Sequence, residues 1–139
     1  MTDEIAFIDS NVLIYHLVQP DHPHSAPSTA LLARVRAGKE RAYLASTVIA
    51  ECAFVCARVY GTDNRHIASA LQEILSYSGV RTDHPEALVA ALDLWGTQGP
   101  LSFADCFHLA LAKQLGMTRI YTFDRKMDCY PGVERIEPR

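Results

Sequence analysis

The sequence predicts a single α/β domain built around a parallel sheet. Short apolar runs typical of strands alternate along the chain with longer segments of helical periodicity. The length of 139 residues is that of one domain with one hydrophobic core. Hydrophobic residues make up 49% of the chain and charged residues 21%, a globular composition that excludes a disordered or fibrous protein.

The first half of the chain is predicted to contain two strands and three helices. Ile5-Ala6-Phe7-Ile8 is a continuous apolar run, typical of a strand buried on both faces, and residues 42–45 form a second short strand. The helices are indicated by capping residues before each periodic segment and by glycine or proline after it. We expect them over 12–18, from Ser25 or Ser28 to Gly38, and from a Ser46-Thr47 cap to about Tyr60.

The second half continues the alternation of strands and helices. Helices are expected from Thr62-Asp63 to about residue 78 and over 84–95, with a brief strand over 80–82 between them. The clearest helix begins after Ser102 and ends at Gly116, and its buried side is expected to carry Phe103, Phe107, Ala110, Leu111 and Leu115. Strands are then predicted over 120–122 and, from a weaker signal, over 133–136.

Charge and composition exclude several classes of function. The 13 Lys and Arg against 16 Asp and Glu give a formal charge of −3, so overall attraction to nucleic acid or anionic membranes cannot drive binding. No apolar run reaches the ~18 residues of a membrane span, and the N-terminus lacks the basic start of a signal peptide, so we expect a cytoplasmic protein. The four cysteines fit no zinc spacing and are expected to be reduced.

Four acidic residues fall where predicted strands end or helices begin. Asp9 follows the first strand, Glu51 lies early in the helix after the second, Asp105 opens the clearest helix, and Asp124 follows the last clear strand. Ligands of parallel sheets bind at the carboxyl ends of strands, so these acids can share one edge. Acids that converge there repel one another unless a cation such as Mg²⁺ binds. Each acid also has a purely structural explanation in helix capping, the helix dipole or a turn.

Four segments of the chain resemble the signature segments of a known family. They are similar to those of PIN-domain ribonucleases, most closely the VapC-type toxins of bacterial toxin–antitoxin pairs, and they occur in the family's order at 9–15, 46–51, 103–110 and 121–126. The resemblance extends over roughly residues 5–136. It implies a single PIN domain over residues 1–139 with a three-layer α/β/α sandwich and a mainly parallel central sheet.

The resemblance also implies an activity and its residues. The family's acidic quartet falls on the four acids named above, which would act as catalytic residues and as ligands of one or two Mg²⁺ or Mn²⁺ ions. The bound metal would activate a water molecule that attacks an RNA phosphodiester bond. Supporting positions fall on Asn11 and Thr122, and Arg125 and Lys126 could contact RNA phosphates. The implied partners are an RNA substrate, a VapB-like antitoxin and a second copy in a homodimer.

Two alternative functions remain open. A haloacid-dehalogenase-like phosphatase also places an aspartate after its first strand, but it needs a second aspartate where this chain has Asn11. A catalytically silent PIN-like module for RNA binding or scaffolding commonly lacks acids of the quartet, whereas all four are present here. The favoured interpretations of Trp95, His22-Pro23-His24, His108 and Asp128 are structural ones, respectively core, loop, helix face and surface.

Overall fold

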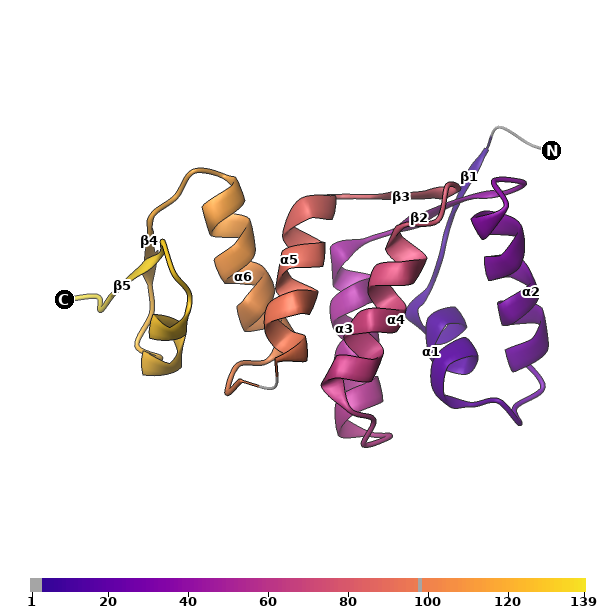
Figure 1. Ribbon diagram of the computed structural model, residues 1–139, viewed down its shortest axis with the longest axis horizontal. Helices are drawn as coiled ribbons and strands as arrows, with labels where there is room; N and C mark the ends of the chain where they lie inside the picture. Colours follow the sequence, from indigo (N-terminus) through magenta and orange to yellow (C-terminus); the bar gives the residue numbers. More distant parts are fainter. Residues whose placement is uncertain (1–3, 98) are drawn as a thin grey trace.

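The computed structural model describes residues 4–97 and 99–139, and its elements confirm the predicted alternation (Figure 1). No helix of this part of the chain is long and apolar enough to cross a membrane. The elements are β1 (Ile5–Phe7), α1 (Ser10–Val18), α2 (Ser25–Arg36), β2 (Arg41–Leu44), α3 (Ser46–Arg58), α4 (Asn64–Leu75), β3 (Val80–Thr82), α5 (Pro85–Gly96), α6 (Phe103–Gln114), β4 (Arg119–Tyr121), the 3₁₀ turn η1 (Arg125–Cys129) and β5 (Glu134–Ile136).

The strands form two parallel sheets. One has the order β1-β2-β3 and the other pairs β4 with β5, and every pairing is parallel, as the sequence predicts. The mainly parallel sheet is divided into two in this chain, because β4 pairs with β5 and not with β1. Figure 1 shows β4 and β5 toward one end of the longest axis and β1 and β2 toward the other, with α5 and α6 between the two sheets.

Two burial expectations are wrong, one at β1 and one at the end of α6. The run that forms β1 was expected to be buried on both faces, yet Ile5, Ala6 and Phe7 are all exposed and only Ile8 is buried. Leu115, expected on the buried side of α6, is also exposed. An apolar side chain is favoured in an apolar environment, but the sequence does not show which other segment, if any, covers it. Within residues 4–97 and 99–139, β1 has a neighbouring strand on one side only.

The helix caps agree with the sequence at two sites and differ at two others. The Asp63 carboxylate accepts a hydrogen bond from the Arg65 amide at 2.8 Å, and the Ser102 hydroxyl accepts one from the Asp105 amide at 3.2 Å. In contrast, His24 stands at the N-cap of α2 and Ala45 at that of α3. The serines expected there lie inside the first helical turns, where they make other contacts.

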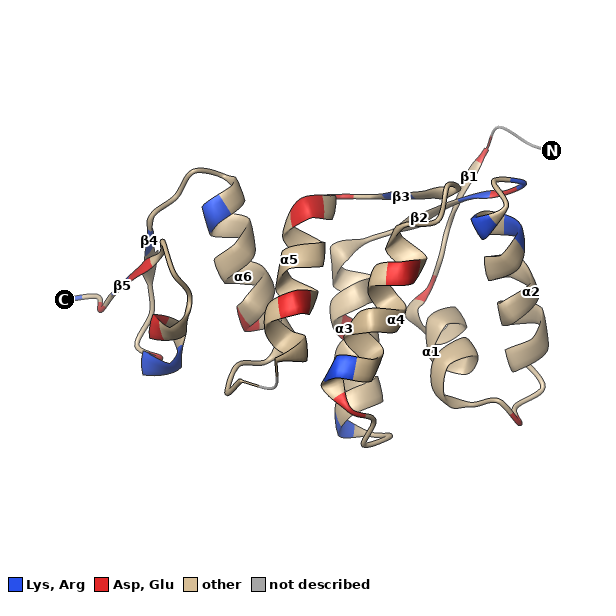
Figure 2. Ribbon diagram, in the orientation of Figure 1, with Lys and Arg blue, Asp and Glu red and all other residues tan. Residues whose placement is uncertain are grey.

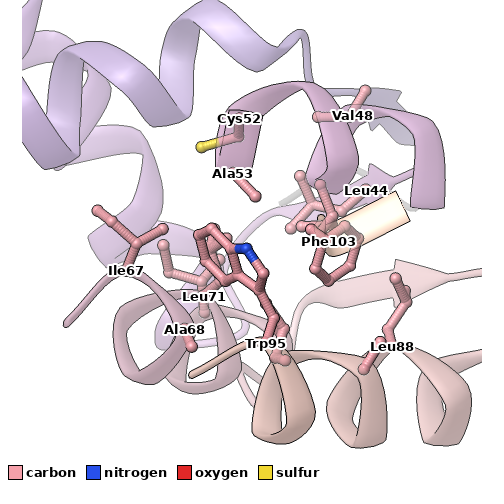
Figure 3. Packing of buried hydrophobic residues seen from close by; sticks show 14 of the residues in the cluster. Leu44, Val48, Cys52, Ala53, Ile67, Ala68, Leu71, Leu88, Trp95 and Phe103 are labelled. Atoms are coloured by element: carbon pink, nitrogen blue, oxygen red, sulfur yellow. The ribbon is translucent and has the colours of Figure 1, made fainter. Parts of the chain in front are cut away.

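The hydrophobic core extends from α1, α2 and β2 through α3, α4, α5 and α6, and Figure 3 shows the part of it around Trp95. The indole packs edge-on against Phe103 with ring centroids 6.0 Å apart, which confirms Trp95 as a core residue. All four cysteines are free, as expected, and only Cys129 is exposed. Burial raises the pKa of Cys106 to about 12, so this thiol stays protonated and unreactive at neutral pH.

Asp83 connects the end of β3 to the start of α3. Its carboxylate accepts hydrogen bonds from the Ser46 amide at 2.8 Å and from the Ser46 hydroxyl at 2.7 Å. Partial burial alone raises the pKa of Asp83, but the hydrogen bonds from Ser46 outweigh it and leave the net pKa below its usual range. The ionised carboxylate therefore stabilises the fold.

Asp83→Asn is expected to lower the free energy of unfolding by roughly 1–2 kcal/mol at pH 7, since it weakens two hydrogen bonds to a charged acceptor. Because the folded-state pKa is depressed, this stabilisation is present above the unfolded-state pKa of about 3.9 and disappears as pH falls through the lower folded-state value. Urea titrations from pH 7 to pH 3.5 measure the difference between the two proteins. A difference that stays constant over this range would contradict the assignment.

Candidate active site

The buried hydroxyl of Ser10 links the segment that carries Asp9 to Glu51 on α3. Asp9 ends the segment after β1 and stands at the N-cap of α1, where its backbone carbonyl accepts a hydrogen bond from the Val12 amide at 3.1 Å. Its side chain does not cap the helix, and no residue in the described part of the chain donates a hydrogen bond to its carboxylate. Its neighbour Ser10 is buried and donates a hydrogen bond to the Glu51 carboxylate from α3. The fold thus brings these two acids to the carboxyl end of β1 and leaves the Asp9 carboxylate available to a ligand.

Asp105 lies in the first turn of α6 and lines a cleft of about 540 Å³. The capping pattern seen in the sequence uses its backbone amide, so its half-buried carboxylate is left to face the cleft. The walls come from α3, the start of α4, the end of α5, the segment before α6, the first turn of α6 and η1. The lining residues are Ala50, Phe54, Ala57, Arg58, Asn64, Trp95, Pro100, Leu101, Ser102, Phe103, Ala104, Asp105 and Lys126.

The cleft combines a carboxylate with two cations and an exposed aromatic ring. Arg58 comes from the end of α3 and Lys126 from η1, while the Phe54 side chain is 60% exposed. Of the two basic residues predicted to contact RNA, Lys126 lines the cleft and Arg125 does not. Phe54 could not be predicted as a cleft residue, because in sequence an apolar residue on an apolar helix is indistinguishable from a core residue.

Asp124 lies between β4 and η1, toward the end of the molecule opposite β1 (Figure 1). Its carboxylate accepts a hydrogen bond from the Lys126 amide at 3.0 Å and so caps η1. Its own backbone amide donates to the Thr122 hydroxyl at 3.0 Å. Asn11, the other supporting position, is exposed in the first turn of α1.

The four acids do not come together within one chain. No group of three His, Cys, Asp or Glu side chains among residues 4–97 and 99–139 could hold a metal ion. Figure 2 shows acidic positions spread along the whole molecule. Carboxylate oxygens are the ligands that Mg²⁺ and Mn²⁺ prefer, so the donor chemistry fits a divalent ion, but the geometry of a single chain does not provide a complete site.

The remaining polar candidates have structural roles. His22 and His24 pack against Tyr15, with ring centroids 4.3 Å and 5.1 Å from the tyrosine ring. Asp128 forms a surface ion pair with Arg135, with its Oδ1 at 3.1 Å from the Arg135 Nε. His108 is exposed on α6. These placements agree with the structural interpretation of each residue.

A family model and two relatives of known family show which family the chain belongs to. The family model described as PIN domain matches residues 6–132. A VapC ribonuclease of Mycobacterium bovis and ribonuclease VapC13 of Mycobacterium tuberculosis are each 31% identical over 137 residues, covering 93% of this chain and 97% of the relative. A crystal structure of VapC20 from Mycobacterium tuberculosis, described as a toxin that cleaves the sarcin–ricin loop, aligns with 97% of this chain and 100% of its own at a TM-score of 0.43 and 20% identity.

Proposed function

The chain belongs to the PIN-domain family, and from this premise we propose that it is a VapC-type endoribonuclease, the toxin of a toxin–antitoxin pair. The match of the family model covers nearly all of the chain, and the two relatives that share 31% of its residues are named as ribonucleases. The observation in the structure that carries the proposal is the cleft in which the Asp105 carboxylate lies with Arg58 and Lys126.

The side chains of the cleft suit an RNA strand. Arg58 can bind a phosphate through its planar guanidinium, and Lys126 adds a second positive charge within the same cleft. The exposed ring of Phe54 offers a surface on which a base can stack, an interaction worth about 1–3 kcal/mol per base. This local positive charge lets a chain with a net charge of −3 bind a polyanion.

The proposed cofactor is Mg²⁺ or Mn²⁺, held by carboxylates of Asp9, Glu51, Asp105 and Asp124. Dependence on divalent metals is general among PIN-domain nucleases. The Asp9 carboxylate supports this proposal because no described part of the chain uses it for folding. The acids must first be assembled, since one chain does not gather three of them.

The proposed partners are an RNA substrate, a VapB-like antitoxin and a second copy of the chain, in the cytoplasm. Exposed apolar side chains support an interaction with other polypeptides, because contiguous exposed apolar surface commonly marks binding sites. On α3 and just after it these side chains are Phe54, Val59 and Tyr60. The alternative of a silent RNA-binding module would retain the cleft but would not need the acids.

Removal of divalent metal is expected to abolish RNA cleavage while leaving RNA binding to Arg58 and Lys126 in place. The experiment compares cleavage and filter binding of a mixed-sequence RNA in excess EDTA, and again after Mg²⁺, Mn²⁺ or Ca²⁺ is added. Mg²⁺ or Mn²⁺ should restore cleavage. Cleavage that persists in EDTA would contradict the metal site, and binding without cleavage under every metal would favour the silent module.

A further inference from the structure

Two strands of this chain have an open edge. β1 is the end strand of the three-stranded sheet, and β4 has β5 as its only neighbour within the described residues. Large apolar side chains stand exposed on or beside both strands. The exposed fractions are 44% for Ile5 and 64% for Phe7 at β1, and 73% for Tyr121 and 70% for Phe123 at β4.

Both edges can accept a further strand. An open edge strand presents unpaired backbone groups that recruit another strand. A two-stranded sheet is only marginally stable in water, and parallel pairing is weaker than antiparallel pairing. The β4–β5 pair is therefore expected to need a further strand, and the exposed edge of β1 offers one of the same parallel type.

The same chain cannot join the two edges while its helices stay packed. Helix α6 is anchored in the core by its buried face, which includes Phe103 and Leu109. Only residues 115–118 separate α6 from β4, and four residues reach at most about 14 Å. Helices α5, α4 and α3 lie between α6 and β1 (Figure 1), and each packed pair of helices is separated by about 8–10 Å.

We propose that β4 of a second copy pairs in parallel with β1, and that the exchange is reciprocal, giving a strand-exchanged homodimer. Each sheet then continues from β3, β2 and β1 into β4 and β5 of the other copy. The side chains favour a register with Phe7 opposite Tyr121 of the partner subunit. Phe7 already pairs with Tyr43 on β2, with ring centroids 5.9 Å apart, so the partner subunit's Tyr121 extends a row of aromatic rings across the sheet.

The exchange completes the acidic site, and this step rests on the proposed function. Parallel pairing aligns the carboxyl ends of β1 and β4. Asp9 follows β1 by two residues and Asp124 follows β4 by three. Each site therefore combines Asp9 and Glu51 of one chain with Asp124 of the partner subunit, which explains why a single chain gathers no metal site.

Cysteine cross-linking tests the exchange without reference to activity. In a Cys129→Ser background, which removes the one exposed thiol, a Phe7→Cys chain and a size-tagged Tyr121→Cys chain are unfolded together, refolded and oxidised. Neighbouring strands lie about 4.8 Å apart, a separation that a disulfide can bridge. We expect a disulfide between the two chains, seen as a heterodimer on a non-reducing gel.

The control replaces Tyr121→Cys with Val89→Cys, an exposed site on α5, which should give no cross-link with the Phe7→Cys chain. In a chain that carries both Phe7→Cys and Tyr121→Cys, a disulfide within one chain would overturn the proposal. The proposal would also be overturned by a folded mixture of single variants that forms no disulfide, or by a protein that sediments as a monomer at micromolar concentration.

Complementation then tests the shared site. Asp9→Asn and Asp124→Asn chains should each be inactive alone. When the two are refolded together, random pairing puts one chain of each kind in half of the dimers, and each such dimer has one intact site out of two. The mixture should therefore recover about a quarter of wild-type cleavage. Cross-linking with no recovered cleavage would overturn the shared site. A wild-type protein that cleaves no RNA would instead refute the proposed function, and the cross-linking result would still decide the exchange.

Discussion

Asparagine in place of Asp105 is expected to lower kcat for RNA cleavage by on the order of 10²- to 10³-fold, the scale on which a group that stabilises charge in a transition state contributes. The carboxylate lines the cleft, whereas the α6 cap uses only the Asp105 amide and the Ser102 hydroxyl. Asparagine keeps the size of the side chain and removes its charge. Cleavage should therefore fall while the melting temperature stays within a few degrees of the wild type.

The same substitution on α5 provides a matched control. Asp93 is exposed and accepts a hydrogen bond from Gln72 at 2.7 Å, so Asp93→Asn changes the net charge by the same amount at a site outside the cleft. Its cleavage rate should equal that of the wild type. If both variants lose activity equally, or if neither does, Asp105 has no specific role in the reaction.

The order and type of the elements could be predicted because their signals are local. Turn and cap residues such as Asp63, Ser102 and Gly116 mark boundaries that depend only on neighbouring backbone. The division of the sheet could not be predicted, because pairing between strands depends on contacts distant in sequence. The apolar run at β1 correctly predicted a strand with apolar side chains. It could not show that no other segment of the same chain buries these side chains.

The site shows the same limit. Placement of Asp9 after β1 and of Asp105 at the start of α6 follows from local patterns, and the structure agrees with both. Whether the carboxylates converge depends on where β4 lies, which no local pattern specifies. The contribution of Arg58 to the cleft likewise depends on how α3 packs beside α6, so its charge alone does not distinguish it from other surface arginines.

Gly79 is the position where a single added methyl group is expected to damage the fold most. This buried glycine precedes β3, where its amide donates to the Val35 carbonyl at 3.0 Å and its carbonyl accepts from the Ala42 amide at 2.9 Å. A Cβ atom there would lie 2.1 Å from the Glu40 carbonyl oxygen and 2.7 Å from that of Val35. Both atoms belong to the backbone, so neither can turn aside as a side chain would.

Gly79→Ala should therefore lower the free energy of unfolding by roughly 3 kcal/mol or more, at the upper end of the cost of overpacking. Gly99→Ala is the matched control, since a Cβ at Gly99 meets nothing within 4 Å, and it should change stability by less than about 0.5 kcal/mol. Urea denaturation at pH 7 measures both. Equal denaturation midpoints for the two variants would mean that the Val35–Glu40 turn moves to accommodate the added methyl group. The expected loss of stability in Gly79→Ala would show that this turn is rigid and holds β2 in place. Because β1 pairs with β2, the turn then also fixes the strand that positions Asp9.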